Sequence, residues 1–366
     1  MTQITGTVAL NADGCRARLD RLVGRLREGG LDAALLTDLH HVHYLSGHWQ
    51  RTVLAVGMLV KAEGSAILAT GTEPLSNAVA DEKLLFESNR LGTLVDDQCA
   101  ALLEALGPHL QGVRRLGCDD VARPWLLPDL EVEDVGPTMR ALRRKKDPDE
   151  VAMIRRGVAG CDAAYDAARR VLTPGVTEVE VFAAMHAAAV NAVGEPIGEF
   201  GNDFRSGGGG GPPRVRPVEA GETMPLDIGV VVRGYASDLC RTFAVDRQPS
   251  AAQREAHRRV VEALDHVARN VRPGVRCAAI YDQVFKMIDG RDGWHFTHHL
   301  GHGIGLKCHE APRLNPNWDD TFQVGDVFTA EPGLYADELR GGVRIENDYL
   351  VTESGVDQLS HYPVDL

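Results

Sequence analysis

Five side chains that can bind metal ions lie in the C-terminal part of the chain: Asp227, Asp238, His302, Glu331 and Glu346. Four carboxylates and one imidazole would bring more negative charge together than a protein core tolerates without cations. Groups of these types that share a pair of divalent ions can activate water and stabilise an oxyanion. The residue types therefore predict a paired-metal centre that hydrolyses an amide-like bond.

The donor atoms also indicate which metal ions fit such a centre. A ligand set that is rich in carboxylates, poor in imidazole and free of thiolate favours two Mn²⁺ ions, with Co²⁺, Fe²⁺ or Zn²⁺ as substitutes. Paired ions lower the pKa of a bridging water. Glu331 is the ligand that we expect to contact this water and to carry its proton during catalysis.

The two aspartates are expected on one β-hairpin. Residues 226–232 and 235–245 have strand patterns and are joined by an Arg-Gly turn. With the turn centred there, Asp238 lies opposite Gly229, and Asp227 is its diagonal neighbour at a Cα separation of roughly 7–8 Å. Carboxylates across that gap could bracket two metal ions roughly 3.5–4 Å apart. The alternative is that both aspartates are solvated strand ends.

The other three ligand candidates also lie in informative local sequences. His302 stands between two glycines, which allow a backbone to approach a ligand closely, and Glu331 stands where Pro-Gly breaks a strand-like run. Glu346 is central in an apolar run, and burying a glutamate is costly unless it is paired or metal-bound. Arg344 shares the face of Glu346, so it either contacts a substrate carboxylate or forms a structural pair with Glu346.

Length and composition limit the function classes. The chain has 366 residues, which allows two domains of ordinary size. Its net charge of −13 argues against nucleic-acid and anionic-membrane partners. No apolar run reaches the roughly 18–20 residues of a membrane span, and the N-terminus lacks the pattern of an export signal. Seven scattered cysteines are expected to be reduced thiols, so we expect a cytoplasmic protein.

Periodicity divides the chain into an α/β domain, residues 1–138, and an α+β domain, residues 139–366, with helices beside an antiparallel sheet. The basic segment 139–150 connects the two domains, and its Asp147-Pro148 pair is typical of a helix start. The pattern predicts helices at residues 15–27, 97–106, 150–171, 177–193, 251–270 and 278–289, and strands at residues 31–37, 52–60, 65–70 and 115–118.

Four separate segments resemble the signature segments of the pita-bread metallopeptidases. They read LDIGVVVRGYASDLCRTFAV, FTHHLGHGIGLKCHEAP, FTAEPGLY and GVRIENDYLV. Within that family they are most similar to the proline-specific branch, prolidase (Xaa-Pro dipeptidase) and aminopeptidase P. The segment GLDAALLTDLHHVHYLSG resembles the creatinase-like N-terminal domain of the same enzymes. The resemblance thus covers nearly the whole chain.

This resemblance implies a creatinase-like domain over residues 1–138 and a catalytic pita-bread domain over residues 139–366. It implies hydrolysis of X-Pro dipeptides, or of the N-terminal X-Pro bond of short peptides, by a hydroxide that bridges two metal ions. The implied metal ligands are Asp227, Asp238, His302, Glu331 and Glu346, with Asp238 and Glu346 bridging the ions and with His302 and Glu331 on one ion. His309 and His298 are then expected to join Glu331 in catalysis and Arg344 in substrate binding.

The resemblance also implies a homodimer, because the N-terminal domain of this family commonly closes over the site of a neighbouring subunit. His48 and Trp49, just past the YLSG segment, are candidates for that contact. The alternative for Trp49 is a place in the core of its own domain.

One departure from the family pattern affects the expected substrate. The family carries another active-site histidine upstream of the first metal aspartate, but this chain has no histidine between His186 and His257. The region instead contains a glycine run, residues 207–211, followed by Arg214 and Arg216. Either arginine, or backbone N–H groups of the glycine run, could replace the histidine; alternatively the run is only a surface loop.

Two other functions follow from this departure. A non-peptide amide hydrolase or a lyase on the same fold would use the altered loop for a different small substrate. A catalytically silent binding protein is the third alternative, and the five intact ligand candidates argue against it.

Overall fold

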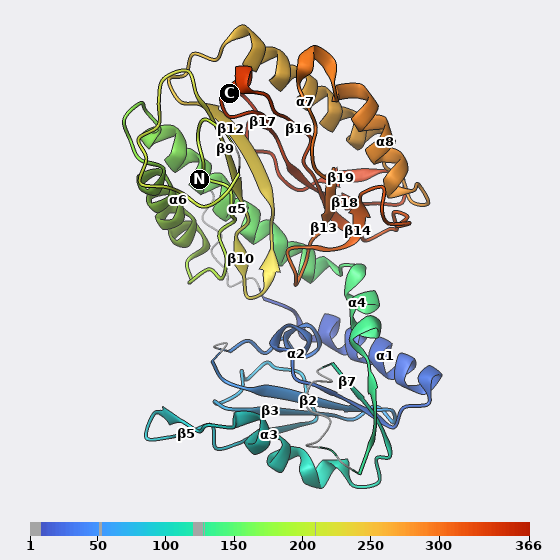
Figure 1. The fold of residues 1–366 in the computed structure, drawn as a ribbon. Coiled ribbons are helices and arrows are strands. Elements are labelled where there is room, and N and C mark those ends of the chain that lie inside the picture. Colours follow the sequence, from blue (N-terminus) through green and yellow to red (C-terminus); the bar gives the residue numbers. More distant parts are fainter. Residues whose placement is uncertain (1–8, 51–52, 120–126, 128, 209) are drawn as a thin grey trace. The chain divides into compact units, whose positions relative to one another are not determined.

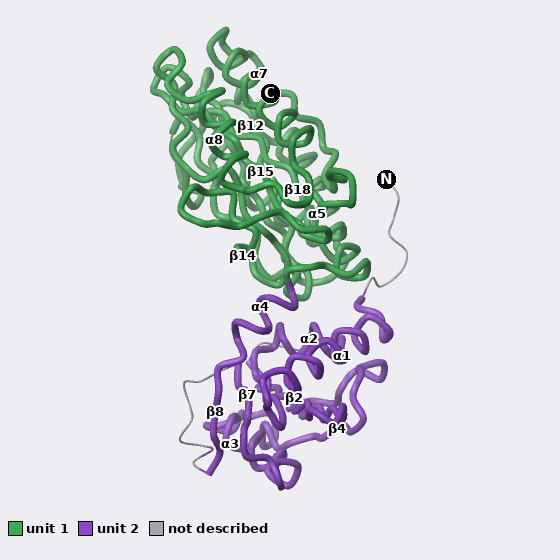
Figure 2. Tube along the Cα trace, turned by 90° about the vertical axis from the view of Figure 1, so that its right-hand side faces the viewer, with its two compact units in different colours: residues 1–8, 144–366 green, residues 9–143 purple. Residues whose placement is uncertain are grey.

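The computed structural model describes residues 9–50, 53–119, 127, 129–208 and 210–366. The chain divides into two compact units, Ala9–Arg143 and Arg144–Leu366 (Figure 2). This division falls inside the predicted connecting segment, whose first part is helical because α4 spans Gly136–Arg144. The functional boundary after residue 138 stays a prediction.

The N-terminal unit contains a six-stranded mixed sheet in the order β4-β3-β2-β1-β7-β8 (Figure 1). Its strands are β1 (Ala33–Leu36), β2 (Val56–Lys61), β3 (Ala66–Thr70), β4 (Glu82–Leu85), β7 (Arg115–Cys118) and β8 (Glu131–Asp134), and β5 (Asn89–Arg90) pairs with β6 (Thr93–Leu94). Its helices are α1 (Ala12–Gly29), α2 (Leu39–Ser46), α3 (Gln98–Leu106) and α4. The predicted α/β class is confirmed.

Local signals explain where α1 begins and ends. The Asn11 side chain accepts a hydrogen bond from the backbone N–H of Gly14 at the N-terminus, and Gly30 ends the helix in a left-handed conformation. The apolar stripe of this helix is buried; it consists of Leu19, Leu22, Val23 and Leu26. The helix therefore presents one apolar face to the core of the unit.

The candidates for a partner contact lie just after α2. His48 is buried, and its Nε2 atom lies 3.2 Å from Gln50 Oε1. Trp49 is half-buried and packs edge-on against His43, with ring centroids 5.2 Å apart. Their contact with a second subunit stays a prediction.

The C-terminal unit is an α+β assembly in which the strand pairs among the described residues are antiparallel, and this class was predicted. Its strands are β9 (Thr223–Ile228), β10 (Val231–Val232), β11 (Tyr235–Ala236), β12 (Leu239–Ala244), β13 (Gly301–Gly303), β14 (Glu310–Leu314), β15 (Val327–Ala330), β16 (Gly333–Leu334), β17 (Val343–Arg344), β18 (Asn347–Val351) and β19 (Val356–Gln358). Its helices are α5 (Pro148–Val171), α6 (Glu178–Val193), α7 (Ala251–Asn270) and α8 (Cys277–Ile288).

Helices cover the strands of this unit on two sides. Helix α5 packs against β10, β11 and β12, whereas α7 packs against β16 and β17 (Figure 1). The sheet β14-β13-β15-β18-β19 shares a buried apolar core with α7 and α8. Helix α5 begins with the predicted Asp147-Pro148 signal, to which Glu150 adds a reciprocal cap.

All seven cysteines are free thiols. Within the described ranges, none of the helices combines the length and the hydropathy that crossing a bilayer requires.

Candidate metal centre

A tight hairpin carries the two aspartates. Val232 pairs with Tyr235, and the intervening Arg233 and Gly234 both have positive φ angles, as the narrow turns of twisted hairpins require. Strand β9 pairs with β12 in the register Ile228–Leu239 and Asp227–Cys240. Continued by one residue, this register places Asp238 opposite Gly229, as predicted.

The close approach of the facing strand explains why residue 229 is a glycine. A Cβ atom at this position would lie 2.8 Å from the carbonyl oxygen of Ser237 and 3.6 Å from Asp238 Oδ1. The facing strand therefore approaches too closely for a side chain. The glycine therefore allows the two strands of the hairpin to pack closely, and it also leaves room beside the Asp238 carboxylate.

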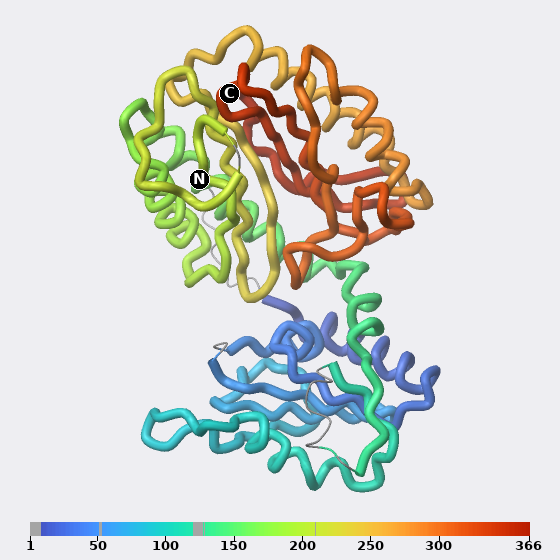
Figure 3. Tube along the Cα trace, viewed as in Figure 1, coloured from blue at the N-terminus to red at the C-terminus, as the bar shows by residue number. Residues whose placement is uncertain are grey.

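The other three ligand candidates come from the neighbouring sheet. His302 is the middle residue of β13, Glu331 directly follows β15, and Glu346 lies between β17 and β18. A hydrogen bond of 3.0 Å from the Glu346 N–H to the Cys240 carbonyl joins this sheet to β12. Figure 3 shows the β9–β12 region in yellow beside the orange and red segments that contain these residues.

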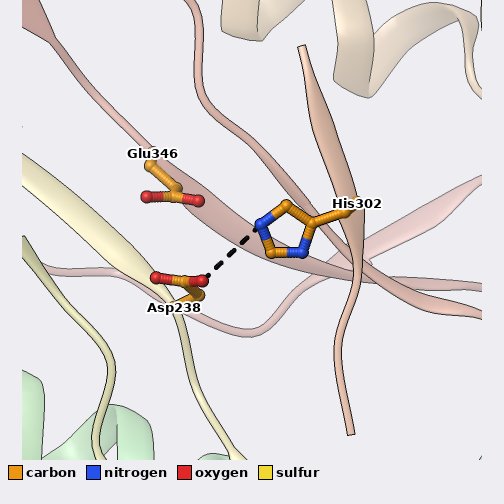
Figure 4. A group of neighbouring side chains, drawn as sticks. All are labelled: Asp238, His302 and Glu346. Atoms are coloured by element: carbon orange, nitrogen blue, oxygen red, sulfur yellow. Dashed lines mark ion pairs between the residues drawn. The ribbon is translucent and has the colours of Figure 1, made fainter. Parts of the chain in front are cut away.

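The structure brings these side chains together. Ligand atoms of Asp238, His302 and Glu346 lie within 4.8 Å of one another (Figure 4). His302 Nε2 lies 3.7 Å from Asp238 Oδ2 and 3.7 Å from Glu331 Oε1. Asp227 adjoins the same group, because its charge acts on Asp238, Glu331 and Glu346.

Burial and mutual repulsion dominate the electrostatics of the four carboxylates. Burial raises the pKa of Asp238 well above its ordinary value, and the charges of Glu346 and Asp227 raise it further. Burial likewise raises the pKa of Glu331 and of Glu346, with the charge of Asp227 as a second cause in both. A cluster of this kind gains strongly from divalent cations, which offset the repulsion.

His302 is held in the form that binds metals. Its Nδ1–H donates to the Gly303 carbonyl at 3.2 Å, which leaves the lone pair of Nε2 directed at Asp238 and Glu331. Burial lowers the pKa of His302 to about 3, so the imidazole is neutral at physiological pH. The flanking glycines were expected to admit a ligand. Instead, Cβ atoms there would collide with the backbone of Thr329 and Ala311 in the adjoining strands.

The hydrogen bonding of the Glu346 carboxylate indicates whether these residues fit a cation. Thr329 Oγ1 donates a hydrogen bond to Glu346 Oε1. The other oxygen, Oε2, is buried and has no hydrogen-bond partner among the described residues. An unsatisfied buried carboxylate oxygen on a side chain that lies beside Asp238 and His302 fits a divalent cation, so the residues present suit a metal centre.

Arg344 neutralises part of the negative charge of the carboxylate cluster. Its Nη2 atom lies 2.7 Å from Asp227 Oδ2 and 2.5 Å from Asp203 Oδ2, and its side chain is only 10% exposed. The guanidinium therefore pairs with these two aspartates and not with Glu346, which was one of its two expected partners; contact with a substrate carboxylate stays a prediction. Its Nη1 donates to the Tyr335 hydroxyl at 3.3 Å.

Three more histidines surround the carboxylates. His298 donates from Nδ1 to the His299 carbonyl at 2.8 Å and accepts at Nε2 from the Tyr335 hydroxyl at 2.9 Å. His299 Nδ1 lies 3.2 Å from Glu331 Oε1. The His309 ring stacks on that of His302, with centroids 3.5 Å apart. Burial lowers the pKa of His298 and of His299 to about 4, so both are neutral at pH 7.

A cavity of about 230 Å³ opens beside these histidines. It is lined by His299, Gly301, His302, His309, Glu310, Arg313, Asn315 and Trp318. Arg313 is paired with Asp320 at 3.1 Å and lies over the Trp318 ring. The space next to two of the candidate ligands can thus receive a small substrate.

The region that lacks the family's histidine is fixed by ion pairs. Arg214 donates to Glu178, whose side chain is fully buried, and the Nη2–Oε1 distance is 2.6 Å. Arg216 forms a similar pair of 2.6 Å with Glu222. Both arginines that the sequence offered as replacements therefore have structural partners in this unit.

Sequence reasoning missed Asp203, Thr329 and Tyr335. Tyr335 closes the Glu-Pro-Gly-Leu-Tyr segment, and Thr329 precedes Glu331 by two residues on the same strand face, so their spacing was a usable signal. Asp203 lies far from the ligand motifs in an irregular segment. Nothing in its local sequence distinguishes it from a surface aspartate.

Comparisons with known proteins assign both parts of the chain to known domain families. Residues 152–353 match the model of metallopeptidase family M24, and residues 18–144 match the creatinase/prolidase N-terminal domain. A relative named Xaa-Pro dipeptidase from Pyrococcus horikoshii is 26% identical over 355 residues, which are 94% of this chain and 96% of the relative.

Solved structures share the fold of the whole chain. The prolidase of Pyrococcus horikoshii OT3 superposes with a TM-score of 0.77 at 24% identity, covering 96% of this chain and 99% of that one. The X-Pro aminopeptidase of Thermotoga maritima MSB8 gives 0.78 at 22% identity, covering 95% and 98%. With more than half of its residues matched by the family model, this chain belongs to metallopeptidase family M24 and carries a creatinase/prolidase N-terminal domain.

Proposed function

We propose that this metallopeptidase hydrolyses X-Pro dipeptides with two divalent ions held by Asp227, Asp238, His302, Glu331 and Glu346. The observation that carries the proposal is the buried carboxylate cluster whose Glu346 Oε2 has no partner among the described residues. The likeness to an Xaa-Pro dipeptidase along 94% of the chain supports the substrate class. Mn²⁺ is the preferred ion because the donors are mostly carboxylate oxygens.

Two divalent ions held by these five residues would activate a water molecule as the nucleophile at neutral pH and would polarise the scissile carbonyl. Side chains of the protein transfer the proton, contact the substrate and orient the ligands. Glu331, with His299 3.2 Å from its Oε1, takes the nucleophile's proton and passes it to the leaving nitrogen. His309, which lines the cavity, and His298 contact the substrate, and Arg344 keeps the Asp227 carboxylate oriented.

The proposal extends to the setting of the enzyme. Residues 1–138 form the creatinase-like domain and residues 139–366 the catalytic domain. The protein works as a homodimer in the cytoplasm, and His48 and Trp49 of one subunit approach the site of the other.

Hydrolysis of Ala-Pro, Gly-Pro and a longer X-Pro peptide tests the proposal, with metal-free and Mn²⁺-supplied protein assayed in parallel. We expect Mn²⁺-dependent cleavage of the dipeptides, with Asp238→Asn as the inactive control. Faster cleavage of the longer peptide would instead identify an aminopeptidase. No cleavage of any X-Pro substrate would overturn the assignment.

The altered loop favours one second candidate, a hydrolase or lyase for a small non-peptide substrate. Arg214 and Arg216, in the region where the resemblance implies a further histidine, are bound by Glu178 and Glu222. Two bound metal ions per chain without peptidase activity would favour this candidate. Absence of metal binding would instead favour a silent binding protein.

A further inference from the structure

Arg241 lies directly behind the candidate metal ligands. It is the third residue of β12, three residues after Asp238, and it is 1% exposed. Its Nη1 donates to the backbone carbonyl of Glu346 at 2.6 Å and to that of Cys240 at 2.8 Å. One guanidinium thus fixes the backbone on both sides of the junction at which Glu346 enters the site.

The other edge of the same guanidinium binds the segment Leu359–Leu366. Nη2 donates to the carbonyl of Tyr362 at 2.9 Å, and Nε donates to that of Pro363 at 3.1 Å. Nη2 also donates to Asn347 Oδ1 at 2.9 Å, next to Glu346. The planar fork of arginine suits this task, because it reaches several acceptors in fixed directions.

A second connection runs from the segment to Asp238. The Asp348 backbone N–H donates to Ser360 Oγ at 3.1 Å, and the Leu359 N–H donates to the Asp348 carbonyl at 2.8 Å. The Asp348 carboxylate in turn accepts from the backbone N–H of Asp238 at 3.2 Å. The segment therefore touches the supports of two ligand candidates, Glu346 and Asp238.

Helix α5 anchors the segment from outside. Arg169 pairs with Asp365 at 3.0 Å, and its Nε donates to the Tyr362 hydroxyl at 3.0 Å. The same hydroxyl donates to Asp166 at 3.1 Å. Among the described residues, none of these groups lines the cavity beside His302 and His309.

We propose that Arg241 is a positioning residue of the metal centre and that the segment Leu359–Leu366 holds it in place. The backbone of Glu346 and of Asp238 is set by this network, and two ions close together tolerate little displacement of their ligands. Loss of the segment then weakens metal binding although no ligand is removed. The inference rests on the proposed metal centre.

The test is a titration of the full chain with Co²⁺, followed by the visible absorption bands of the bound ion. Three variants disturb the network at different points: Arg241→Lys, Arg169→Met, and a chain that stops after Ser360. Arg155→Met is the matched control, because Arg155 also lies on α5 and pairs at 3.0 Å with Asp357 of β19. Thermal melting of the metal-free proteins is measured separately.

We expect Arg241→Lys and the shortened chain to bind Co²⁺ about 10- to 100-fold more weakly, as loss of an outer partner of a metal ligand does elsewhere. Arg169→Met should show a smaller loss in the same direction, with altered Co²⁺ bands, and Arg155→Met should match the native chain. A purely structural role would lower the melting temperature and leave the Co²⁺ affinity of the folded protein unchanged, which overturns the proposal.

Two further outcomes separate this inference from the proposed function. If the shortened chain does not fold, Arg241→Lys and Arg169→Met decide, since each retains the segment. If the native chain itself binds no Co²⁺, the proposed metal centre fails and this inference fails with it. Normal native binding with unchanged variants overturns only the role of Arg241.

Discussion

Arg344 and Asp227 form an ion pair of 2.7 Å at the edge of the carboxylate cluster. The arginine is nearly buried and gives the cluster a fixed positive charge in addition to any ions that bind there. Asp203 pairs with the same Nη2 atom of this guanidinium. The negative charge that Asp227 contributes is thus partly balanced before metal binds.

The first prediction concerns this pair. We expect Arg344→Met to lower the melting temperature of the metal-free protein, because both aspartates lose their cation. Addition of Mn²⁺ should then raise the melting temperature more than it does for the native chain. Calorimetry with and without Mn²⁺ measures both effects. Arg340→Met, which removes a 47% exposed arginine and its 3.6 Å pair with Glu219, is the control; equal Mn²⁺ responses in all three proteins would contradict the prediction.

A second prediction addresses the ligands themselves. Asp238→Asn and Glu346→Gln keep the side-chain shape and remove one charge each. We expect either change to abolish Mn²⁺-dependent turnover, a larger loss than the roughly 10- to 100-fold caused by losing an outer partner. Metal analysis of the purified proteins and dipeptide hydrolysis measure the result, with the exposed Glu353→Gln as the control. Full activity in either ligand variant would exclude the paired-metal mechanism.

A third prediction follows from the pKa of Asp162 in α5. Burial raises this pKa to about 6 from an ordinary value of 3.8, and Oδ1 is buried without a hydrogen-bond partner among the described residues. The folded state therefore keeps a proton that the unfolded chain releases between about pH 4 and pH 6. The resulting stabilisation is complete below that window and is lost as the pH rises through it.

Replacing Asp162 by Asn should remove this loss. We expect the variant to be more stable than the native chain by about 1–2 kcal/mol at pH 7, after allowance for partial solvent screening. Below about pH 4 the two should be nearly equal. Urea unfolding at several pH values measures the difference, with the exposed Asp282→Asn as the control. A difference that does not vary with pH would refute the argument.

A fourth prediction uses the glycines beside His302. Gly301 has a φ of 152°, and a Cβ there would collide with the Thr329 carbonyl. Gly301→Ala should therefore disrupt the pairing of β13 and reduce both stability and metal binding. Gly24→Ala, in α1 with open space around it, should stabilise the protein by about 0.5–1 kcal/mol. Chemical unfolding of both variants checks the contrast, and similar effects from the two changes would count against it.

Sequence patterns predicted the parts of the fold that have strong periodicity or clear caps. The long helices α5 and α7 and the Asp227–Asp238 hairpin follow from apolar spacing, capping residues and the Arg-Gly turn. The short helix α2 was missed, because eight residues that include three histidines give no clear apolar stripe. Helix α4 was read as a connecting segment for its run of basic residues, although one buried face of this helix includes Met139.

In the candidate site, too, some residues could be predicted from the sequence and others could not. Ligand candidates could be found from the sequence because burying a charged residue in an apolar strand is costly unless the residue is paired or binds a metal ion. Asp203 and Arg241 could not, since their importance comes from tertiary contacts with Arg344 and with the carbonyl of Glu346. The roles of Arg214 and Arg216 likewise depended on finding Glu178 and Glu222, which lie elsewhere in the unit.

The backbone bridge between Cys240 and Glu346 determines when the ligands can first meet. Closing so long a loop costs chain entropy, and such non-local pairings form late in folding. A newly synthesised chain therefore offers no complete set of ligands until β18 has docked beside β12. We therefore expect metal incorporation at the proposed site to follow folding rather than to guide it.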